Sequence, residues 1–264
     1  MDPKTLVWID GRVRRRDEAG VPVDDSAYAE GRGCYSTARV RGGTPDFEDH
    51  HVRRLRRGAE ALRLGDFDEA AVRRALRDLA REAFPDGDGI VRVQLSRGEP
   101  SVRVVGIPRA LGEEAAAWHL VCAQQPHEGP LLVGGHKLTN RLAIALALDE
   151  ARDAGADEVL LFDRHGWLVE GARSNVVAIG TDDEPVTPPL SRGAVSGIAR
   201  RVLFERVPEL REQDLRRDDL FTARAVFCTN AVRGARPVAS LDGVPLPRET
   251  SRWHALLNAA LEDH

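Results

Sequence analysis

Apolar positions along this chain switch between a period of two, typical of strands, and a period near 3.6, typical of helices. The runs with a period of two are bounded by turns rich in Gly and Asp, and they predict strands. The expected strands are LVWIDGRV, CYSTARVRGG, IVRVQLSRG, VRVVGIP, HLVCAQQ, EVLLFD, WLVEG, SNVVAIG and the runs within AVFCTNAVRGARPVASLDG. EVLLFD and WLVEG enclose the turn residues 164–166, so these two runs predict a hairpin.

Five further segments have helical spacing. In the first, Val52, Leu55 and Ala59 share one face, with arginines on the other. The expected helices cover 51–64, 69–84 before Pro-Asp-Gly, 140–154 before a glycine, the run ARRVLFERV and 253–261.

This mixture of strands and separate helices predicts an α+β fold with two domains. We expect a small N-terminal α/β domain over 1–112 and a larger C-terminal domain over 113–264, connected near 109–117. Ligand sites commonly form where the loops of two domains meet, so we expect the functional site between the domains.

Composition excludes several classes of protein. Among 264 residues, 42% are hydrophobic and 30% charged, with 38 basic against 42 acidic, so the basic excess of a nucleic-acid binder is absent. No run of 18 apolar residues exists and the start, MDPKTLVWID, lacks an apolar leader, which argues against a membrane or secreted protein. Cys34, Cys122 and Cys228 are widely spaced and suit core positions in a reducing cytosol. We therefore expect a cytoplasmic protein without a metal site.

Lysine is almost absent from the sequence. Only Lys4 and Lys137 occur, so 38 − 2 = 36 of the basic residues are arginine. Lys137 lies deep in the chain, within LLVGGHKLTN. Arginine can replace lysine as a surface cation, but only lysine can lose its proton and attack a carbonyl carbon. Lys137 is therefore a candidate nucleophile, and the alternative is a surface lysine retained by chance.

Such a lysine would suit pyridoxal phosphate (PLP), which also needs an acid at its pyridine nitrogen and a cup for its phosphate. Glu170, at the end of the run WLVEG, is a candidate acid, or else an ordinary solvated carboxylate. Residues 197–199 lie where a loop enters a helix, so their amides could bind an anion or simply water.

The run HKLTNRLAIALALDEARDAGADEVLLFDRHGWLVEGARSNVVAI resembles the core of the fold-type IV PLP enzymes. This class contains branched-chain and D-amino-acid aminotransferases and aminodeoxychorismate lyases. Four more blocks resemble it in the same order: GRGCYSTARV, HHVRRL, TPPLSRGAVSGIAR and TNAVRGARPVASLDG. The resemblance covers nearly the whole chain.

By position, the resemblance implies that Lys137 binds the cofactor as a Schiff base and moves the proton. It implies that Glu170 is the partner of the pyridine nitrogen. Arg54 is implied to bind the phosphate, and the H-x-x-R-L spacing from His51 favours it over the neighbouring Arg53.

The resemblance also implies that Ile198 and Ala199 offer backbone amides to the phosphate. Many relatives have Thr at the position of Ala199, and Ser or Thr at the position of Ala231. Fewer side-chain hydrogen bonds to the cofactor are therefore expected here.

Within the class, HKLTNRL, TNAVRGARPV and GRGCYSTARV are most similar to the lyases. D-amino-acid aminotransferases tend to have a glutamate after the tyrosine, where this chain has Ser36. Tyr35 and Thr37 are expected to line the substrate pocket. Arg103 or Arg97 occupies the region where some relatives bind a substrate carboxylate, or each is a surface cation.

The resemblance therefore implies an aminodeoxychorismate lyase that forms 4-aminobenzoate and pyruvate through Lys137. The alternative is an aminotransferase for D-amino acids, branched-chain L-amino acids or primary amines, distinguished by the pocket around Tyr35, Arg103 and Arg233. A PLP-binding protein without turnover is a third possibility. The resemblance further implies a homodimer acting on a small amine or amino acid, with neither nucleic acid nor membrane as a partner.

Overall fold

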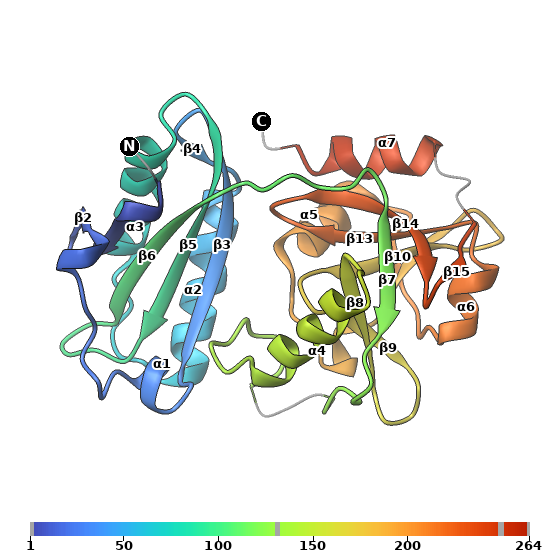
Figure 1. Cartoon of the computed structure of the whole chain (residues 1–264), viewed down its shortest axis with the longest axis horizontal. Coiled ribbons are helices and arrows are strands. Elements are labelled where there is room, and N and C mark those ends of the chain that lie inside the picture. Colours follow the sequence, from blue (N-terminus) through green and yellow to red (C-terminus); the bar gives the residue numbers. More distant parts are fainter. Residues whose placement is uncertain (1–2, 130–132, 248–250, 263–264) are drawn as a thin grey trace. The chain divides into compact units, whose positions relative to one another are not determined.

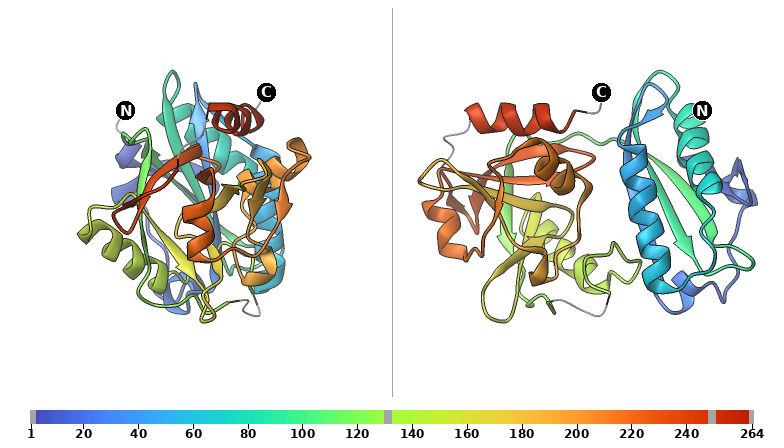
Figure 2. Two further views of the ribbon diagram at one scale, coloured as in Figure 1. Left: turned by 90° about the vertical axis from the view of Figure 1, so that its right-hand side faces the viewer. Right: turned by 180° about the vertical axis from the view of Figure 1, so that it is seen from behind.

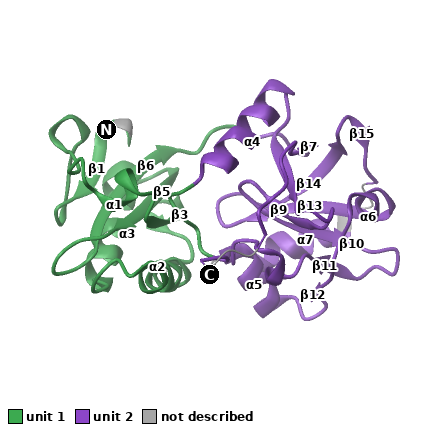
Figure 3. Cartoon of the chain, turned by 90° about the horizontal axis from the view of Figure 1, so that it is seen from below, with its two compact units in different colours: residues 1–113, 136–140 green, residues 114–135, 141–264 purple. Residues whose placement is uncertain are grey.

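The computed structural model describes residues 3–129, 133–247 and 251–262, and the chain forms two compact units. Unit 1 contains Met1–Glu113 and His136–Asn140, and unit 2 contains Glu114–Gly135 and Arg141–His264 (Figure 3). This division differs from the expected one at residue 113 and over residues 136–140. Within the second segment, the backbone of residues 137–139 pairs with a strand of unit 1.

Unit 1 is built on a six-stranded sheet in the order β2-β1-β6-β5-β3-β4, with antiparallel neighbours throughout (Figure 1). The strands are β1 (Leu6–Ile9), β2 (Arg12–Arg15), β3 (Gly33–Arg41), β4 (Thr44–Pro45), β5 (Asp88–Ser96) and β6 (Arg103–Ala110). Three short helices, η1 (Pro3–Thr5), η2 (Arg16–Glu18) and α1 (Ser26–Ala29), precede or connect the first strands along the chain. Helices α2 (Glu48–Leu62) and α3 (Glu69–Ala83) cover one face of the sheet (Figure 2).

Alternation along the strands creates this covered face. Val91, Val93 and Leu95 of β5 are fully buried, whereas Arg92 and Gln94 between them point to the opposite face. The two faces of the sheet therefore differ: one packs on helices, and the other presents polar side chains.

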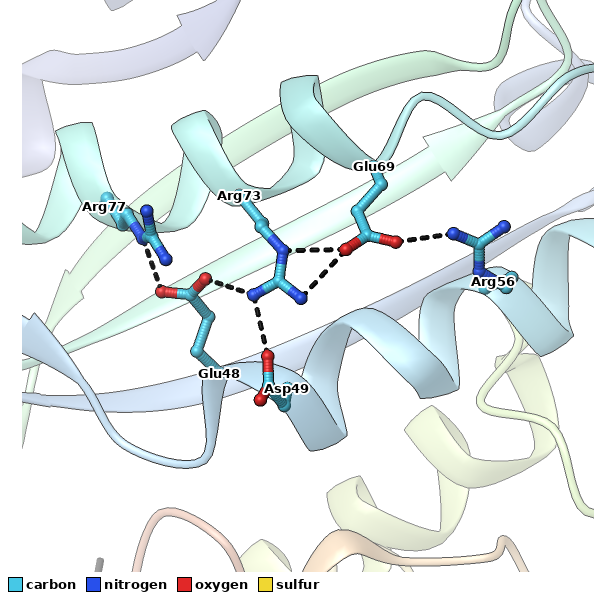
Figure 4. A network of polar contacts seen from close by, with 6 residues as sticks. All are labelled: Glu48, Asp49, Arg56, Glu69, Arg73 and Arg77. Atoms are coloured by element: carbon cyan, nitrogen blue, oxygen red, sulfur yellow. Dashed lines mark hydrogen bonds and ion pairs between the residues drawn. The ribbon is translucent and has the colours of Figure 1, made fainter. Parts of the chain in front are cut away.

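Helices α2 and α3 are also joined by a network of ion pairs (Figure 4). Arg73 Nη1 lies 2.7 Å from a Glu48 oxygen and 2.8 Å from an Asp49 oxygen, and Arg73 also pairs with Glu69. Arg77 and Arg56 extend the network at its two ends. Because most of these side chains are partly exposed, water screens the charges and each pair contributes little to stability.

Unit 2 is built on a nine-stranded mixed sheet in the order β12-β11-β10-β13-β14-β7-β8-β9, with β15 paired to β14. The strands are β7 (Trp118–Cys122), β8 (Glu158–Phe162), β9 (Leu168–Gly171), β10 (Asn175–Ile179), β11 (Pro185–Thr187), β12 (Arg211–Glu212), β13 (Ala225–Asn230), β14 (Gly234–Leu241) and β15 (Val244–Pro245). The helices are α4 (Leu142–Asp153), η3 (Leu190–Arg192), α5 (Ile198–Arg206), α6 (Arg217–Thr222) and α7 (Ser251–Ala260).

The mixture of two sheets and separate helices confirms the α+β class. Strands β8 and β9 form the expected antiparallel hairpin. Helix α2 begins at Glu48, earlier than the expected start at His51, because its first turn contains Glu48 and Asp49, which the N-terminal end of a helix favours. Cys34, Cys122 and Cys228 are all free thiols. None of the helices in the described ranges has the length and apolar character needed to cross a bilayer.

Candidate active-site residues

Lys137 lies on a short segment that extends the edge of β3 in unit 1. Tyr35 donates its backbone N–H to the carbonyl of Lys137 at 2.9 Å, and Thr139 donates to the carbonyl of Gly33 at 2.9 Å. Leu138 and Cys34 form the antiparallel bridge between these contacts. The backbone of the lysine is therefore fixed by the sheet, although its segment belongs to no named strand.

The side chains beside Lys137 form a cationic and aromatic group. The Lys137 Nζ atom lies 5.1 Å from the centroid of the Tyr35 ring, and the Arg92 guanidinium carbon lies 3.8 Å from the same centroid. Both distances are in the range of cation–π contacts. Arg92 also donates to Gln94 at 2.9 Å and lies opposite Thr37 in the strand register. Tyr35, Thr37, Arg92 and Lys137 thus gather at one region of unit 1.

No pattern in the sequence singled out Arg92 as a candidate site residue. It is one of 36 arginines, and alternation within β5 shows only that it points away from the helices. Its place beside Tyr35 follows from the pairing of β3 with β5, which joins residues about sixty positions apart.

Arg54 of α2 points back to the sheet. Its Nε and Nη2 atoms donate to Ser36 Oγ at 3.2 and 2.6 Å, and Ser36 Oγ lies 2.6 Å from His51 Nδ1. Burial, followed by the nearby Arg54, lowers the pKa of His51 well below its usual range, so the imidazole is neutral. The neighbouring Arg53 is exposed. The H-x-x-R-L spacing therefore selects the arginine that faces the sheet.

The two expected carboxylate-binding arginines have other surroundings. Arg103 Nη1 donates to Asp25 Oδ2 at 2.7 Å, and Ser96 Oγ donates to the same oxygen at 2.6 Å. Burial would raise the pKa of Asp25, but these hydrogen bonds hold it below its usual range. The charge of Arg103 is thereby balanced within unit 1, and Arg97 is exposed. The role of either arginine at a substrate carboxylate stays a prediction.

In unit 2, Glu170 is the second-last residue of the hairpin strand β9 and is buried, with 7% of its surface exposed. Val195 donates its backbone N–H to Glu170 Oε2 at 3.0 Å, and Asn175 Nδ2 lies 3.4 Å from the same oxygen. The amide of Asn175 also donates to the carbonyl of Val195 at 3.1 Å. A buried carboxylate held in this way is suited to accept a hydrogen bond from a ligand.

Helix α5 begins at Ile198, and its N-cap is Gly197. No side chain caps this helix end within the described ranges. The first N–H groups of a helix have no acceptor within it, and here Ile198 and Ala199 are buried. A Cβ atom on Gly197 would lie 2.0 Å from Asn175 Oδ1, so glycine is required by this close approach. The arrangement suits an anion at the helix start.

A second buried carboxylate, Glu158 of β8, holds the turn that follows Glu170. It accepts the backbone N–H of Arg173 and the hydroxyl of Ser174, both at 3.1 Å. The largest influence on Glu158 is burial, which raises its pKa. Its only sequence signal is a carboxylate in an otherwise apolar strand, EVLLF.

By chemical type, these residues match what pyridoxal phosphate needs. Unit 1 contains the amine of Lys137 and the guanidinium of Arg54. Unit 2 contains the buried carboxylate of Glu170 and the uncapped helix start at Ile198 and Ala199. Of the remaining substrate-pocket candidates, Arg233 pairs with Glu114 at 3.2 Å.

Comparisons with known proteins extend over almost the whole chain. The model of the family described as amino-transferase class IV matches residues 33–241. The solved structure of 4-amino-4-deoxychorismate lyase from Pseudomonas aeruginosa superposes with a TM-score of 0.84 at 30% identity, covering 97% of this chain and 98% of that one.

Two curated relatives are similarly extensive. D-alanine aminotransferase of Bacillus licheniformis is 26% identical, over 97% of this chain and 98% of that protein. The bifunctional aminodeoxychorismate lyase / D-amino acid transaminase of Mycobacterium tuberculosis is 27% identical, over 92% and 93% of the respective lengths.

These likenesses confirm the expected fold-type IV architecture and the expected relationship to both lyases and aminotransferases. At such identities they establish the family and leave the individual reaction to the residues of the site. The chain belongs to the class IV aminotransferase family, whose members are enzymes that bind pyridoxal phosphate.

Proposed function

We propose that this enzyme is an aminodeoxychorismate lyase, which converts 4-amino-4-deoxychorismate to 4-aminobenzoate and pyruvate. The observation that carries the proposal is the 30% identity to the Pseudomonas aeruginosa lyase over 97% of the chain. The lyase-like block HKLTNRL around Lys137 supports it.

In this proposal, four groups hold the cofactor. Arg54 and the backbone amides of Ile198 and Ala199 bind its phosphate, because a guanidinium and a helix start both favour an anion. Glu170 holds a proton at the pyridine nitrogen. The bound cofactor supplies an electron sink for the charge that develops when the substrate loses a proton.

Lys137 performs the proton transfer. Its Nζ atom would hold the cofactor in the resting enzyme, and the same amine would then act as the base that removes the proton from the ring carbon carrying the substrate amine. Tyr35 and Thr37 orient the substrate ring, and the cation of Arg92 beside Tyr35 suits a substrate that carries carboxylates.

An aminotransferase is the second candidate. Its support is the likeness to D-alanine aminotransferase and to a bifunctional lyase and D-amino acid transaminase. Both reactions begin with the same proton removal by Lys137. In an aminotransferase the same lysine would then return the proton, and the product would be a keto acid. The same side chains therefore serve either reaction.

A product assay separates the two candidates. Purified, PLP-saturated enzyme receives freshly generated aminodeoxychorismate, and 4-aminobenzoate and pyruvate are measured against a Lys137→Ala control. Equal amounts of both products, lost in the control, are expected. If neither product forms while D-alanine or L-leucine converts bound PLP to its amine form, the lyase proposal fails and the aminotransferase stands. Absence of turnover with every amine would instead favour a binding protein.

We further propose that two copies of this chain associate, and that the enzyme works in the cytoplasm. The helix α4 supports association, because Leu142 and Leu146 are 69% and 54% exposed within one chain. An exposed apolar stripe of this kind is typical of an interaction surface. Sedimentation of the wild type and of Leu142→Glu tests this: the wild type is expected to be a dimer and the variant to dissociate more readily.

A further inference from the structure

The contact between Ser36, His51 and Arg54 fixes the positions of the hydrogens. A guanidinium only donates hydrogen bonds, so Ser36 Oγ accepts from Arg54 Nε at 3.2 Å and Nη2 at 2.6 Å. The single hydroxyl proton of Ser36 is then directed at His51 Nδ1, 2.6 Å away. His51 is therefore the neutral tautomer with its proton on Nε2.

A charged His51 is incompatible with this arrangement. If Nδ1 carried a proton, it would donate to Ser36 Oγ, and the hydroxyl proton of Ser36 would face the donors of Arg54. Both Ser36 and His51 are fully buried, so water cannot relieve such a conflict. Burial and the charge of Arg54 both lower the pKa of His51, in agreement with the neutral form.

We propose that Ser36 and His51 are positioning residues that orient Arg54 for the phosphate of pyridoxal phosphate. The inference rests on the assignment of Arg54 in the proposed function. An arginine side chain has several rotatable bonds, and holding its Nε–Nη2 edge reduces the freedom that anion binding would otherwise remove.

The neutrality of this pair distinguishes it from the contact of Arg103, which donates to the carboxylate of Asp25. Arg54 donates to the hydroxyl of Ser36, and the proton of that hydroxyl is directed at the neutral imidazole of His51. Neither Ser36 nor His51 brings a negative charge to the contact.

The test compares two ligands that differ only in the phosphate. Dissociation constants of PLP and of pyridoxal are measured for the apoprotein by absorbance, for the wild type, Arg54→Met and Ser36→Ala, with the exposed Arg53→Ala as matched control. Loss of a hydrogen bond to a charged group predicts about tenfold weaker PLP binding in Ser36→Ala. Pyridoxal binding is expected to be unchanged in that variant.

Two His51 variants separate positioning from packing. His51→Asn retains an acceptor oxygen near the place of Nδ1, and it is expected to keep wild-type preference for PLP over pyridoxal. His51→Leu removes the acceptor and is expected to lose this preference as Ser36→Ala does. Urea unfolding of each apoprotein shows whether a general loss of stability accompanies the change.

The outcomes distinguish failure of the positioning inference from failure of the assignment of Arg54 to the phosphate, on which it rests. If Arg54→Met keeps the preference for PLP, then Arg54 does not bind the phosphate and the assignment itself is wrong. If Arg54→Met loses the preference but Ser36→Ala keeps it, the assignment stands and the positioning inference is overturned. Equal weakening of PLP and pyridoxal in Ser36→Ala also overturns it, because the role would then be structural.

Discussion

The two units hold their functional groups by different means. In unit 1, side chains hold other side chains: Ser36 orients Arg54, and the Tyr35 ring lies beside Lys137. In unit 2, backbone groups do this work, because the N–H of Val195 holds Glu170 and the start of α5 presents its own amides. Side-chain contacts are lost by a change of residue type, whereas backbone groups are lost only when the chain path changes.

Two buried carboxylates sharpen the contrast. Asp25 in unit 1 receives hydrogen bonds from Arg103 and Ser96, and its pKa is lowered. Glu158 in unit 2 receives hydrogen bonds mainly from backbone and hydroxyl groups, and burial raises its pKa. Burial penalises the charge of both. In Asp25 the hydrogen bonds from Ser96 and Arg103 outweigh this penalty, whereas in Glu158 burial outweighs the nearby charge of Arg173 and the hydrogen bonds.

The strongest test of unit 1 is replacement of its amine. Lys137→Ala is expected to lower turnover by about 10³-fold or more, since general-base catalysis alone contributes about 10²–10⁴-fold. Lys137→Arg is the matched variant, because it keeps a cation that cannot act as a base. Product formation by either variant at the wild-type rate would contradict the role of Lys137, provided circular dichroism shows an unchanged fold.

In unit 2, Glu170→Gln tests the acid while keeping its backbone contact. The amide oxygen of glutamine can still accept the N–H of Val195, so the fold is expected to remain intact. Without the negative charge, the protonated form of the pyridine nitrogen would be less stable. We therefore expect kcat to fall about 10²-fold. Glu209→Gln, at an exposed position of the same unit, serves as control. An unchanged kcat in Glu170→Gln would remove the acid from the proposed mechanism.

Gly197→Ala tests whether unit 2 depends on its backbone path. The added Cβ would lie 2.0 Å from Asn175 Oδ1, so either the Asn175 amide, which contacts Glu170 and Val195, or the turn before α5 must shift. We expect a loss of about 1–3 kcal/mol in the free energy of unfolding, measured in urea, together with weaker PLP binding. Gly20→Ala is the control, because no atom lies within 4 Å of a Cβ there. Equal stability of both variants would show that the turn is not tightly fitted.

The smallest effect concerns the pH dependence of stability. Folded Glu158 binds its proton more tightly than the unfolded chain, so it makes stability fall as pH rises from about 4.5 to its raised pKa. Folded Asp25 binds its proton less tightly, so its contribution is lost as pH falls below about 3.8. Urea unfolding between pH 3 and 7 is expected to show the first slope abolished in Glu158→Gln and the second in Asp25→Asn. Identical pH profiles for the two variants would refute the contrast.

Much of the fold could be read from local sequence. The period of two in IVRVQLSRG and the helical spacing after Glu69 identified β5 and α3, because both patterns depend on which side chains face the core. The scarcity of lysine made Lys137 a candidate nucleophile, because the only other lysine in the sequence is Lys4.

The contacts that arrange these residues could not be read in the same way. Arg92 reaches Tyr35 through strand pairing, and Asn175 reaches Glu170 across the turn between two strands. Ser36 differs from a solvated serine only through the helix that covers it. The contact of Arg92 depends on strand register, that of Ser36 on helix packing and that of Asn175 on the path of a turn, and no local period in the sequence encodes these features.

The pairing of residues 137–139 with β3 also has a consequence for how the chain is made. The polypeptide passes between the units at three places, after residues 113, 135 and 140. Protein synthesis proceeds from the N-terminus. The backbone of Gly33 and Tyr35 therefore has no partner for these hydrogen bonds until a segment about a hundred residues later has been synthesised. A fragment that ends at residue 113 would lack both this edge and the lysine. The first unit is thus finished on the ribosome only after the second has begun.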